Sequence, residues 1–447
     1  MLAVACQTIK ASLDRLPNKE SRLKIGFITV DDSLHFYNLS ASRSRPDMLV
    51  IPQFEESSID DLDSITLPIP SGLLVHLTES RNMVEMLLDS LPGLFKDQAR
   101  RGNCLGAALN AAFKLLGTGG GKVCVFQATL PDTGPYILTN RAQPAGKTGT
   151  GAGGSAPQPV VGTNKESALL SPQTTSSQNL ALAAIKSDVS FDFFLFGSGP
   201  DSAGLSRYLD LASLTHLPRV TSGVCYYYPS FNAGVRADVE RFSYELGEYM
   251  ATMFGLEAHF RVRVSRGVRL VDYHGPGFMR FSDLLALPAT PPQTGYAVQL
   301  EIDESIAAPL VCFQTSILYT SSNGERRIRV ITSAIPTTTE VGAVLNSVNV
   351  PAVVGLLSKM AVERALSSRV EDARDAILNK AIELLTVARS EFPASSNPVP
   401  AMAPQVGQNP AAAAASQIVA PQSLMYLPFL VLALARQPAF RGVLLAA

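Results

Sequence analysis

The stretch "VCFQTSILYTSSNGERRIRVITSAI" (residues 311–335) contains two segments rich in β-branched and aromatic residues, one on each side of Asn323-Gly324. Asparagine followed by glycine readily adopts positive φ at both central positions of a tight turn. The stretch therefore predicts a β-hairpin closed by a two-residue turn, with one strand before Asn323 and the other after Gly324.

Three arginines, Arg326, Arg327 and Arg329, follow this turn. Successive side chains of a strand point to opposite faces, so Arg327 and Arg329 share one face while Ile328 and Val330 share the other. We expect the apolar face to pack and the arginine face to stay in solvent or to meet an acidic group. Two interpretations stay open: the arginines keep the strand soluble, or they belong to a surface that binds a peptide or a partner protein.

Further alternating segments with short turns precede the hairpin. They include "AHFRVRVS" (258–265), "VRLVDYHG" (268–275) and "AVQLEID" (297–303). We expect an antiparallel β-sandwich domain over residues 223–335, with a helix at about 234–254 before its strands.

Residues 1–222 alternate helical and strand patterns, which is typical of an α/β domain built around a central sheet. The chain opens on a helix at about 2–14, whereas a domain of this kind usually opens on a central strand. Residues at about 142–187 are rich in Gly, Pro, Ser, Thr and Ala, so we expect a disordered insert there.

Residues 336–447 have a helical pattern. The segment "VEDARDAILNKAIELLTVARSEF" (370–392) carries an apolar stripe, and a Pro/Ala linker follows at about 393–416. The final apolar run, "LMYLPFLVLALA" (424–435), is shorter than the roughly 20 residues of a membrane span, so it predicts a buried helix.

The composition excludes several classes of protein. The 447-residue chain has a formal net charge of −1, so its overall charge does not point to nucleic acid. None of its five cysteines forms a CxxC pair, which excludes a zinc ribbon and indicates a reduced, cytosolic protein.

The glycine-rich "GTGGGKV" (117–123) lacks the spacing and the Ser/Thr of a phosphate loop, so it predicts a helix-to-strand connection. His259 and His274, even with Asp272, lack ligand spacing. We expect no catalytic residue, no metal site and no enzymatic activity.

The segment "HFRVRVSRGVRLVDYHGPGFMR" (259–280) is locally basic, with five arginines against one acidic residue. Arg261 and Arg263 fall on one strand face, opposite the apolar residues expected to face the core. Two guanidinium groups held side by side on a strand suit carboxylate ligands. The alternative is that they pair internally with Glu257 or Asp272. Further residues of a possible basic surface are Arg266, Arg269, Arg326, Arg327 and Arg329.

Four separated blocks resemble, in order, the cargo-adaptor subunit of the COPII inner coat, the Sec twenty-four family. They are "VTSGVCYYYPSFN" (220–232), "FRVRVSRGVRLVDYHG" (260–275), "CFQTSILYTSSNGERRIRVIT" (312–332) and "VAPQSLMYLPFLVLALARQPAFR" (419–441). The resemblance implies a multidomain α/β + β + α protein. Its expected parts are a von Willebrand A-like trunk at 1–222, a β-sandwich at 223–335 and a truncated helical domain at 336–447.

The resemblance also implies a function. Members of this family bind sorting signals of cargo and SNARE proteins for endoplasmic reticulum to Golgi transport, and the family's acidic-signal pocket falls on Arg261 and Arg263 here. Expected partners are the sister inner-coat subunit through the trunk, cargo and SNARE peptides, a Sar-type GTPase indirectly, and an acidic membrane surface. The expected location is the cytoplasmic side of endoplasmic reticulum exit sites and the COPII coat, with no nucleic acid bound.

The chain departs from the family pattern in three places. It lacks the two CxxC pairs of the zinc ribbon, the first strand of the trunk and the C-terminal gelsolin-like domain, so we expect a truncated chain without a cofactor. Two other functions stay open: the sister subunit that stimulates the GTPase, and an isolated peptide-binding module.

Overall fold

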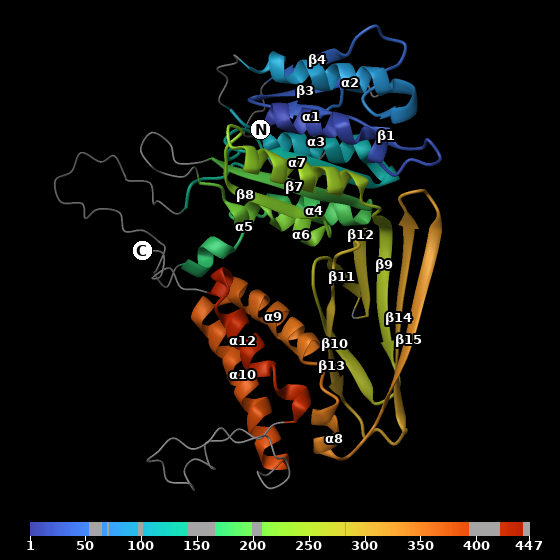
Figure 1. The fold of residues 1–447 in the computed structure, drawn as a ribbon. Coiled ribbons are helices and arrows are strands. Elements are labelled where there is room, and N and C mark those ends of the chain that lie inside the picture. The colour runs from blue at the N-terminus through green and yellow to red at the C-terminus, as the bar shows by residue number, and fades with distance from the viewer. Residues whose placement is uncertain are drawn as a thin grey trace, which may run out of the picture.

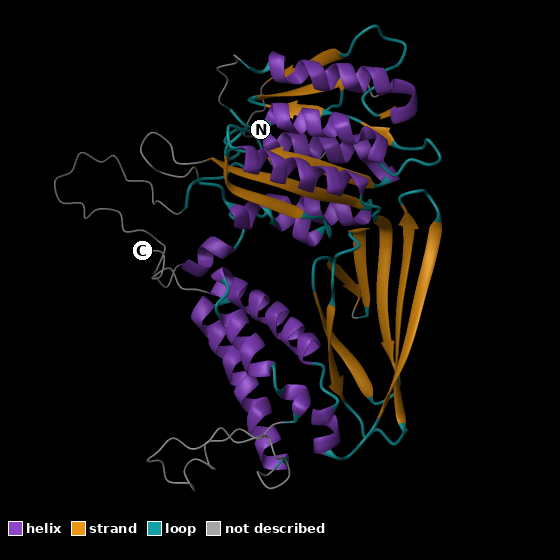
Figure 2. Cartoon of the chain, in the orientation of Figure 1, coloured by secondary structure: helices purple, strands orange, loops and turns teal. Residues whose placement is uncertain are grey.

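The structure is a computed structural model, and it describes residues 1–52, 65–68, 71–96, 102–141, 166–198, 208–281, 283–392 and 421–440. The described residues form an α/β trunk, a β-sandwich and a helical domain (Figure 1). The sandwich and the helical domain lie side by side below the trunk in this view (Figure 2). The expected multidomain α/β + β + α fold class is confirmed.

A parallel sheet of three strands forms the centre of the trunk. Its order is β6 (Gly121–Gln127), β7 (Val189–Ser198) and β8 (Cys225–Phe231). Side chains of β7 alternate between two cores, because every second residue of a strand faces the same side. On one side they pack against α3 (Leu105–Leu116), α4 (Ser176–Lys186), α5 (Leu211–Leu214) and α6 (His216–Val220). On the other side they pack against α1 (Leu2–Ser12) and α7 (Arg236–Ala251).

The trunk has two further sheets. One is antiparallel, with β2 (Ile28–Val30), β3 (Ser33–Asn38) and β4 (Asp47–Pro52), and the other pairs β1 (Lys24–Ile25) with β5 (Val75–His76). Helix α2 (Leu77–Leu94) packs beside α1. Within the described residues, no strand hydrogen-bonds both to β6 and to the β2-β3-β4 sheet. The glycine-rich connection is confirmed, since a 3₁₀ turn at Gly117–Gly119 leads from α3 into β6.

The expected boundary between residues 222 and 223 is wrong. Strand β8 pairs in parallel with β7, and α7 packs on the trunk sheet beside α1, so both elements belong to the trunk. The first strand of the sandwich, β9, begins at Gly255. Composition identifies the tyrosine-rich segment "CYYYPSF" as a strand, but only its pairing with β7 shows that it belongs to the trunk sheet.

The expectation of a disordered insert over about 142–187 is wrong for its C-terminal part. A 3₁₀ turn, η4 (Glu166–Leu170), precedes α4, and α4 buries Leu180 and Ala184 completely against the trunk sheet. The apolar spacing within "NLALAAIK" gives this helix an inward face despite its simple composition. Residues 142–165 lie outside the described part of the chain.

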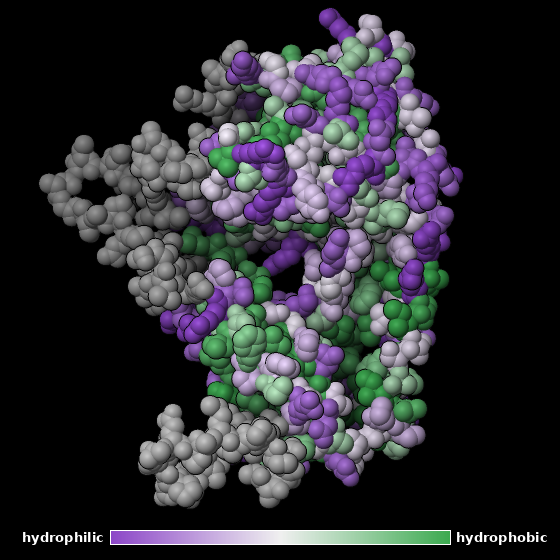
Figure 3. Space-filling model, in the orientation of Figure 1, coloured by the Kyte–Doolittle hydropathy of each residue, from purple (hydrophilic) through white to green (hydrophobic). Residues whose placement is uncertain are grey.

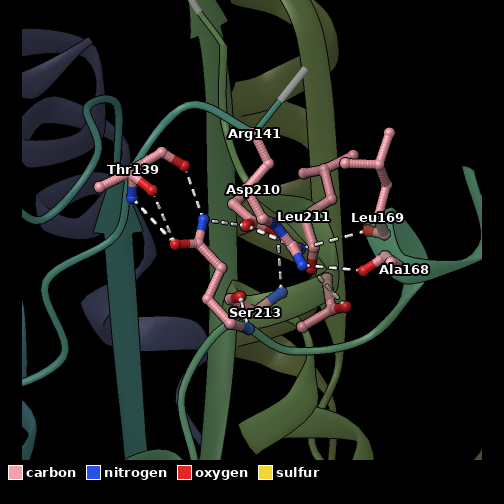
Figure 4. Close-up of polar contacts among 9 residues, drawn as sticks. Thr139, Arg141, Ala168, Leu169, Asp210, Leu211 and Ser213 are labelled. Atoms are coloured by element: carbon pink, nitrogen blue, oxygen red, sulfur yellow. Dashed lines mark hydrogen bonds and ion pairs between the residues drawn. The ribbon is translucent and has the colours of Figure 1, made fainter. Parts of the chain in front are cut away.

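The buried carboxylate of Asp210 joins the two chain segments on either side of residues 142–165 (Figure 4). Arg141 donates from Nη2 to Oδ1 over 2.8 Å, and Gln173 donates from Nε2 to Oδ2 over 2.5 Å. Gln173 also bonds Thr139, since its Oε1 accepts from the Thr139 backbone nitrogen at 3.0 Å. Asp210 in turn caps α5 by accepting from the Ser213 backbone nitrogen at 3.2 Å.

The β-sandwich has one large and one small sheet. The large sheet has the order β11 (Phe278–Phe281), β12 (Leu284–Thr290), β9 (Gly255–Val264), β14 (Leu310–Ser321) and β15 (Arg326–Pro336). The small sheet pairs β10 (Val268–His274) with β13 (Ala297–Ile302). The predicted antiparallel sandwich is therefore confirmed, and every described strand pair in it is antiparallel.

The hairpin joining β14 to β15 has three loop residues instead of the predicted two. The Ser321 nitrogen donates to the Glu325 oxygen at 2.8 Å, and the Gly324 nitrogen donates to the Ser321 oxygen at 2.8 Å. Only Gly324 has positive φ, at +84°, whereas Asn323 does not. This is a three-residue hairpin loop whose last residue has a left-handed backbone conformation. Glycine adopts that conformation without a steric penalty.

The expectation that Ile328 and Val330 lie on the packed face of β15 is wrong. Ile317 pairs with Phe260 on one side and with Arg329 on the other, so Arg329 lies on the same face as the core residue Phe260. Ile328 and Val330 therefore lie on the outer face. Strand alternation correctly separates the arginines from the apolar residues of β15. The register with β14, however, decides which of the two groups faces inward.

The helical domain consists of α8 (Val341–Asn346), α9 (Val350–Ser367), α10 (Val370–Glu391) and α12 (Leu427–Ala435), with 3₁₀ turns η5 (Gln422–Leu424) and η6 (Pro438–Phe440). The predicted apolar stripe of α10 is confirmed, because Ala373, Ile377, Ala381 and Ala388 are its buried residues. The predicted buried helix near the C-terminus is only partly buried: Leu427 and Val431 are in the core, but Phe429 is exposed. The expected linker at about 393–416 lies outside the described residues.

Candidate anion-binding site on strand β9

Strand β9 occupies the centre of the large sheet, between β12 and β14. Val262 is buried and Phe260 packs in the sandwich core, as the sequence predicts. Arg261 and Arg263 therefore share the opposite, outer face, with Cα atoms about 6.7 Å apart along the strand. Their neighbours across β14 are Ser316 and Gln314, respectively.

Arg261 is already engaged in an ion pair. Its Nε donates to Oδ2 of Asp283 over 2.5 Å, and its Nη2 contacts the same oxygen. The arginine side chain is nevertheless 40% exposed. An acidic ligand could therefore reach this guanidinium, but it would compete with Asp283 for it. Internal pairing was one of the two open alternatives, and the acid is Asp283 instead of Glu257 or Asp272.

Arg263 is exposed, and within the described residues it forms no ion pair. Its cross-strand neighbour Gln314 is neutral. The structure thus brings Arg261 and Arg263 together on one face but gives them different environments, because one is neutralised by an internal acid and the other is open to an external one.

Tyr273 supports this site from the small sheet. Its hydroxyl accepts from the Val262 backbone nitrogen at 3.0 Å and donates to the Asp283 backbone oxygen at 3.0 Å. Burial raises the pKa of the Tyr273 hydroxyl, with the Asp283 charge adding to the effect, so the hydroxyl stays protonated. Sequence reasoning missed both Tyr273 and Asp283. The packing of β10 against β9 places Tyr273 beside Arg261, and the pairing of β12 with β9 places Asp283 there.

The other arginines of the possible basic surface do not join this site. Arg266 pairs with Glu304 and Arg269 with its cross-strand neighbour Glu301, all with exposed side chains. Exposed pairs of this kind contribute about 0–1 kcal/mol, so they suit solubility better than ligand binding.

The three hairpin arginines separate into two environments. Arg326 binds within the sandwich, donating to the Glu257 backbone oxygen at 3.1 Å, to its carboxylate at 3.2 Å and to Thr320 Oγ1 at 2.8 Å. Arg327 contacts the Glu325 carboxylate. Hydrogen bonding from Arg329 lowers the pKa of the Tyr319 hydroxyl. Arg327 and Arg329 lie on the inner face, near the edge of the sheet.

Neither histidine of the basic segment has metal ligands around it. His274 Nδ1 lies 2.7 Å from Oε2 of Glu363, which links β10 to α9. Across the described ranges, no group of three or more His, Cys, Asp or Glu side chains could hold a metal ion. The absence of structural zinc stays a prediction. Among the described helices, none combines the length and the apolar character of a membrane span.

The succession of trunk, sandwich and helical domain defines a known class of protein. Residues 1–250 match the Sec23/Sec24 trunk domain, residues 255–338 the Sec23/Sec24 β-sandwich domain and residues 349–444 the Sec23/Sec24 helical domain. The chain belongs to the Sec23/Sec24 family.

Within that family, two similar curated proteins carry the Sec24 name. The chain is 41% identical over 399 residues to the protein transport protein sec24 of Aspergillus fumigatus, covering 89% of this chain and 40% of that protein. It is 40% identical to the SEC24 protein of Pyricularia oryzae, covering 89% of this chain and 38% of the relative. The chain thus spans about two fifths of the length of these relatives.

A solved structure agrees with this branch of the family. The human COPII-coat protein Sec24c superposes with a TM-score of 0.79 at 26% identity, covering 97% of this chain and 51% of that one. The recognised resemblance is therefore confirmed, and it extends through all three domains.

Proposed function

We propose that this chain is the cargo-selecting part of a COPII inner-coat subunit. It binds short acidic sorting signals of cargo and SNARE proteins for transport from the endoplasmic reticulum to the Golgi. Its relatives are named protein transport proteins and a COPII-coat protein, which supports the class of function. The observation that carries the proposed site is the pair Arg261 and Arg263 on the outer face of a central strand.

The chemistry of this site is binding without catalysis. A carboxylate of the signal would first meet the exposed Arg263, and a second carboxylate would displace Asp283 from Arg261. Charge-assisted hydrogen bonds to a guanidinium contribute roughly 1.5–3 kcal/mol each, although the displaced Asp283 offsets part of the gain at Arg261. Micromolar to millimolar affinity is the expected range for such a short signal.

The remaining expectations from the family belong to the same proposal. The trunk pairs with the sister inner-coat subunit, a Sar-type GTPase acts through that assembly, and the chain lies on the cytoplasmic face of the endoplasmic reticulum membrane. The runner-up, the GTPase-stimulating sister, receives less support, since the relatives described above carry the Sec24 name.

Titration of the full chain with a labelled acidic signal peptide tests the site. The double variant Arg261→Gln, Arg263→Gln should weaken binding by about tenfold or more, because two charged donors are lost. The matched control is Arg266→Gln, Arg269→Gln, which removes two exposed arginines from a neighbouring segment and should bind normally. Equal affinity of both variants and the parent chain would remove the site from the proposal. Capture of the purified sister subunit separately distinguishes a coat subunit from an isolated peptide-binding module.

A further inference from the structure

The chain passes from the trunk to the β-sandwich through a short linker. Helix α7 ends at Ala251 and β9 begins at Gly255, so residues 252–254 connect the two domains. Figure 3 shows a hollow between the trunk and the two domains below it. The contacts at the trunk-facing ends of the sandwich strands therefore matter for how the sandwich is held on the trunk.

Ser322, in the loop of the β14–β15 hairpin, binds both backbone groups of Phe254 in this linker. Its hydroxyl accepts from the Phe254 nitrogen at 2.9 Å and donates to the Phe254 oxygen at 2.9 Å. The pairing of β9 with β14 ends one position earlier, at Gly255 and Ser321. The serine side chain thus continues the pairing past the end of the strands and fixes the linker against the hairpin.

The side chain of Phe254 contacts the core of the trunk. Nζ of Lys122 lies 3.1 Å from the centroid of the Phe254 ring, and the ring of Tyr249 in α7 lies 5.6 Å away between centroids. Lys122 is the residue that pairs with the buried Asp192 on β7. A cation over an aromatic face is attracted to it, and more strongly where water is excluded. Phe254 is therefore held by the hairpin through its backbone and by the trunk through its ring.

The start of β9 contains a strained bulge that the same hairpin stabilises. Two residues of β9, Glu257 and Ala258, lie opposite the single residue Tyr319 of β14. Glu257 has a φ of +48°, a left-handed conformation that is usually left to glycine. Arg326 donates to the Glu257 backbone oxygen at 3.1 Å, and Thr320 Oγ1 donates to its carboxylate at 3.0 Å. Such a backbone persists where several contacts hold it, and here they come from the hairpin.

The large sheet meets the trunk at both of its edges. At the hairpin edge, a Cβ placed on Gly324 would lie 3.3 Å from Nη1 of Arg22, so the loop closely approaches the trunk segment before β1 (Figure 1). At the other edge, next to β11, the Gly277 nitrogen donates to the Arg219 oxygen of α6 at 3.0 Å. Loss of the first contact would leave the second as a pivot.

We propose that the β14–β15 hairpin is a clasp that locks a hinge between the trunk and the sandwich. The hinge is residues 252–257, which the ring of Phe254 anchors to the trunk, and the clasp consists of Ser322 and Arg326. Hinges are short segments at the ends of elements that absorb changes in backbone angle. With the clasp closed, the two domains keep one relative angle. With the clasp open, the sandwich tilts about the contact at Gly277.

This inference does not rest on the proposed function. Arg261 and Arg263 follow the hinge on the same strand, so the clasp also fixes where their face of the sheet lies relative to the trunk. Arg326, which the sequence leaves without a role, becomes a positioning residue that acts through Glu257.

The test measures the distance between the two domains in the full chain by double electron–electron resonance. Spin labels on ketone-bearing amino acids replace Tyr244 of α7 and Ile302 of β13, which are each 70% exposed, and leave the cysteines untouched. The parent chain should give one narrow distance distribution. The double variant Ser322→Ala, Arg326→Gln should favour open conformers by about a hundredfold or more and broaden the distribution, because several hydrogen bonds to the hinge are lost.

The matched control is Ser321→Ala, Arg327→Gln in the same hairpin. Both of these side chains bond Glu325 within the hairpin, so the control should keep the narrow distribution of the parent chain. Ser322→Thr retains the hydroxyl and should keep it too. Phe254→Leu removes the ring over Lys122 and should broaden the distribution without touching the clasp.

Circular dichroism shows that each variant is folded before its distances are compared. A distribution as narrow in the folded double variant as in the parent chain overturns the proposal. Equal broadening in the control variant, or a broad distribution in the parent chain, overturns it as well. If the double variant does not fold, Ser322→Ala and Phe254→Leu are measured singly, and two narrow distributions overturn the proposal.

Discussion

Lys122 and Asp192 form a buried ion pair between the neighbouring strands β6 and β7, with Nζ 2.8 Å from Oδ2. The Asp192 carboxylate also accepts from the Val224 backbone nitrogen at 2.7 Å and from the Tyr249 hydroxyl at 2.6 Å. Burial raises the pKa of Tyr249, with the Asp192 charge adding to the effect, so its hydroxyl remains a donor. One carboxylate therefore joins β6, the segment before β8 and α7.

We predict that Lys122→Met destabilises the trunk strongly. Burial lowers the pKa of Lys122 and Asp192 opposes that shift, so each charge depends on the other. Removing one partner of a buried pair costs about 3–5 kcal/mol, because the remaining charge stays buried. Urea unfolding measures the loss. The control is Lys10→Met, whose exposed pair with Asp89 contributes about 1 kcal/mol at most, and equal losses in both variants would contradict the prediction.

The sequence predicts the three domains and the face of β9 that carries Arg261 and Arg263, because alternation along a strand is a local property. It does not predict Asp283, which reaches Arg261 through the pairing of β12 with β9. The sequence-based prediction also assigned the two faces of β15 the wrong way round. The inward face depends on the register of β15 with β14 and of β14 with β9. Helix α4 was not predicted for a different reason. Its Ala- and Leu-rich sequence resembles the simple composition of the preceding insert.

We predict that residues 142–165 can be replaced by a short Gly/Ser linker with little change in melting temperature. Their composition provides few groups for a core, and the entropy of loop closure depends only weakly on length. Both flanks keep their bonds to Asp210. A fall of many degrees in a thermal melt would show that these residues stabilise the trunk.

In contrast to residues 142–165, the buried face of α4 should be needed for the stability of the trunk. Leu180 is fully buried against the trunk sheet, and Leu180→Ala should cost about 2–5 kcal/mol. The neighbouring Leu182 is exposed on the same helix, so Leu182→Ala is the matched control and should change the free energy of unfolding by about 0.5 kcal/mol or less. Similar losses from the two changes would mean that α4 does not pack as described.

We predict that Asp188→Asn stabilises the chain at neutral pH. Burial and the nearby Glu257 raise the pKa of Asp188 in the folded chain. Its carboxyl group therefore contributes stability that is fully present below the unfolded-state pKa, and this stability is lost as the pH rises through the folded-state pKa. Asparagine keeps the shape without the charge and tolerates the residue's φ of +53°. The gain should be about 0.5 kcal/mol at pH 7 and should vanish at pH 3 in parallel urea titrations. A gain that is independent of pH would point to a backbone effect instead.

The last prediction concerns the acid that competes for Arg261. Asp283→Asn removes the negative charge that neutralises this guanidinium, while the backbone oxygen of residue 283 can still accept from Tyr273. An acidic signal peptide should therefore bind more tightly, by about tenfold, since it no longer displaces an internal carboxylate. Asp272→Asn is the matched control, because the Asp272 carboxylate accepts from the Tyr273 backbone nitrogen and touches neither arginine in the described contacts. Fluorescence titration at low salt, with the folded fraction checked by circular dichroism, measures both. Unchanged or weaker affinity in Asp283→Asn, with the fold intact, would show that Arg261 serves the sandwich and not the ligand.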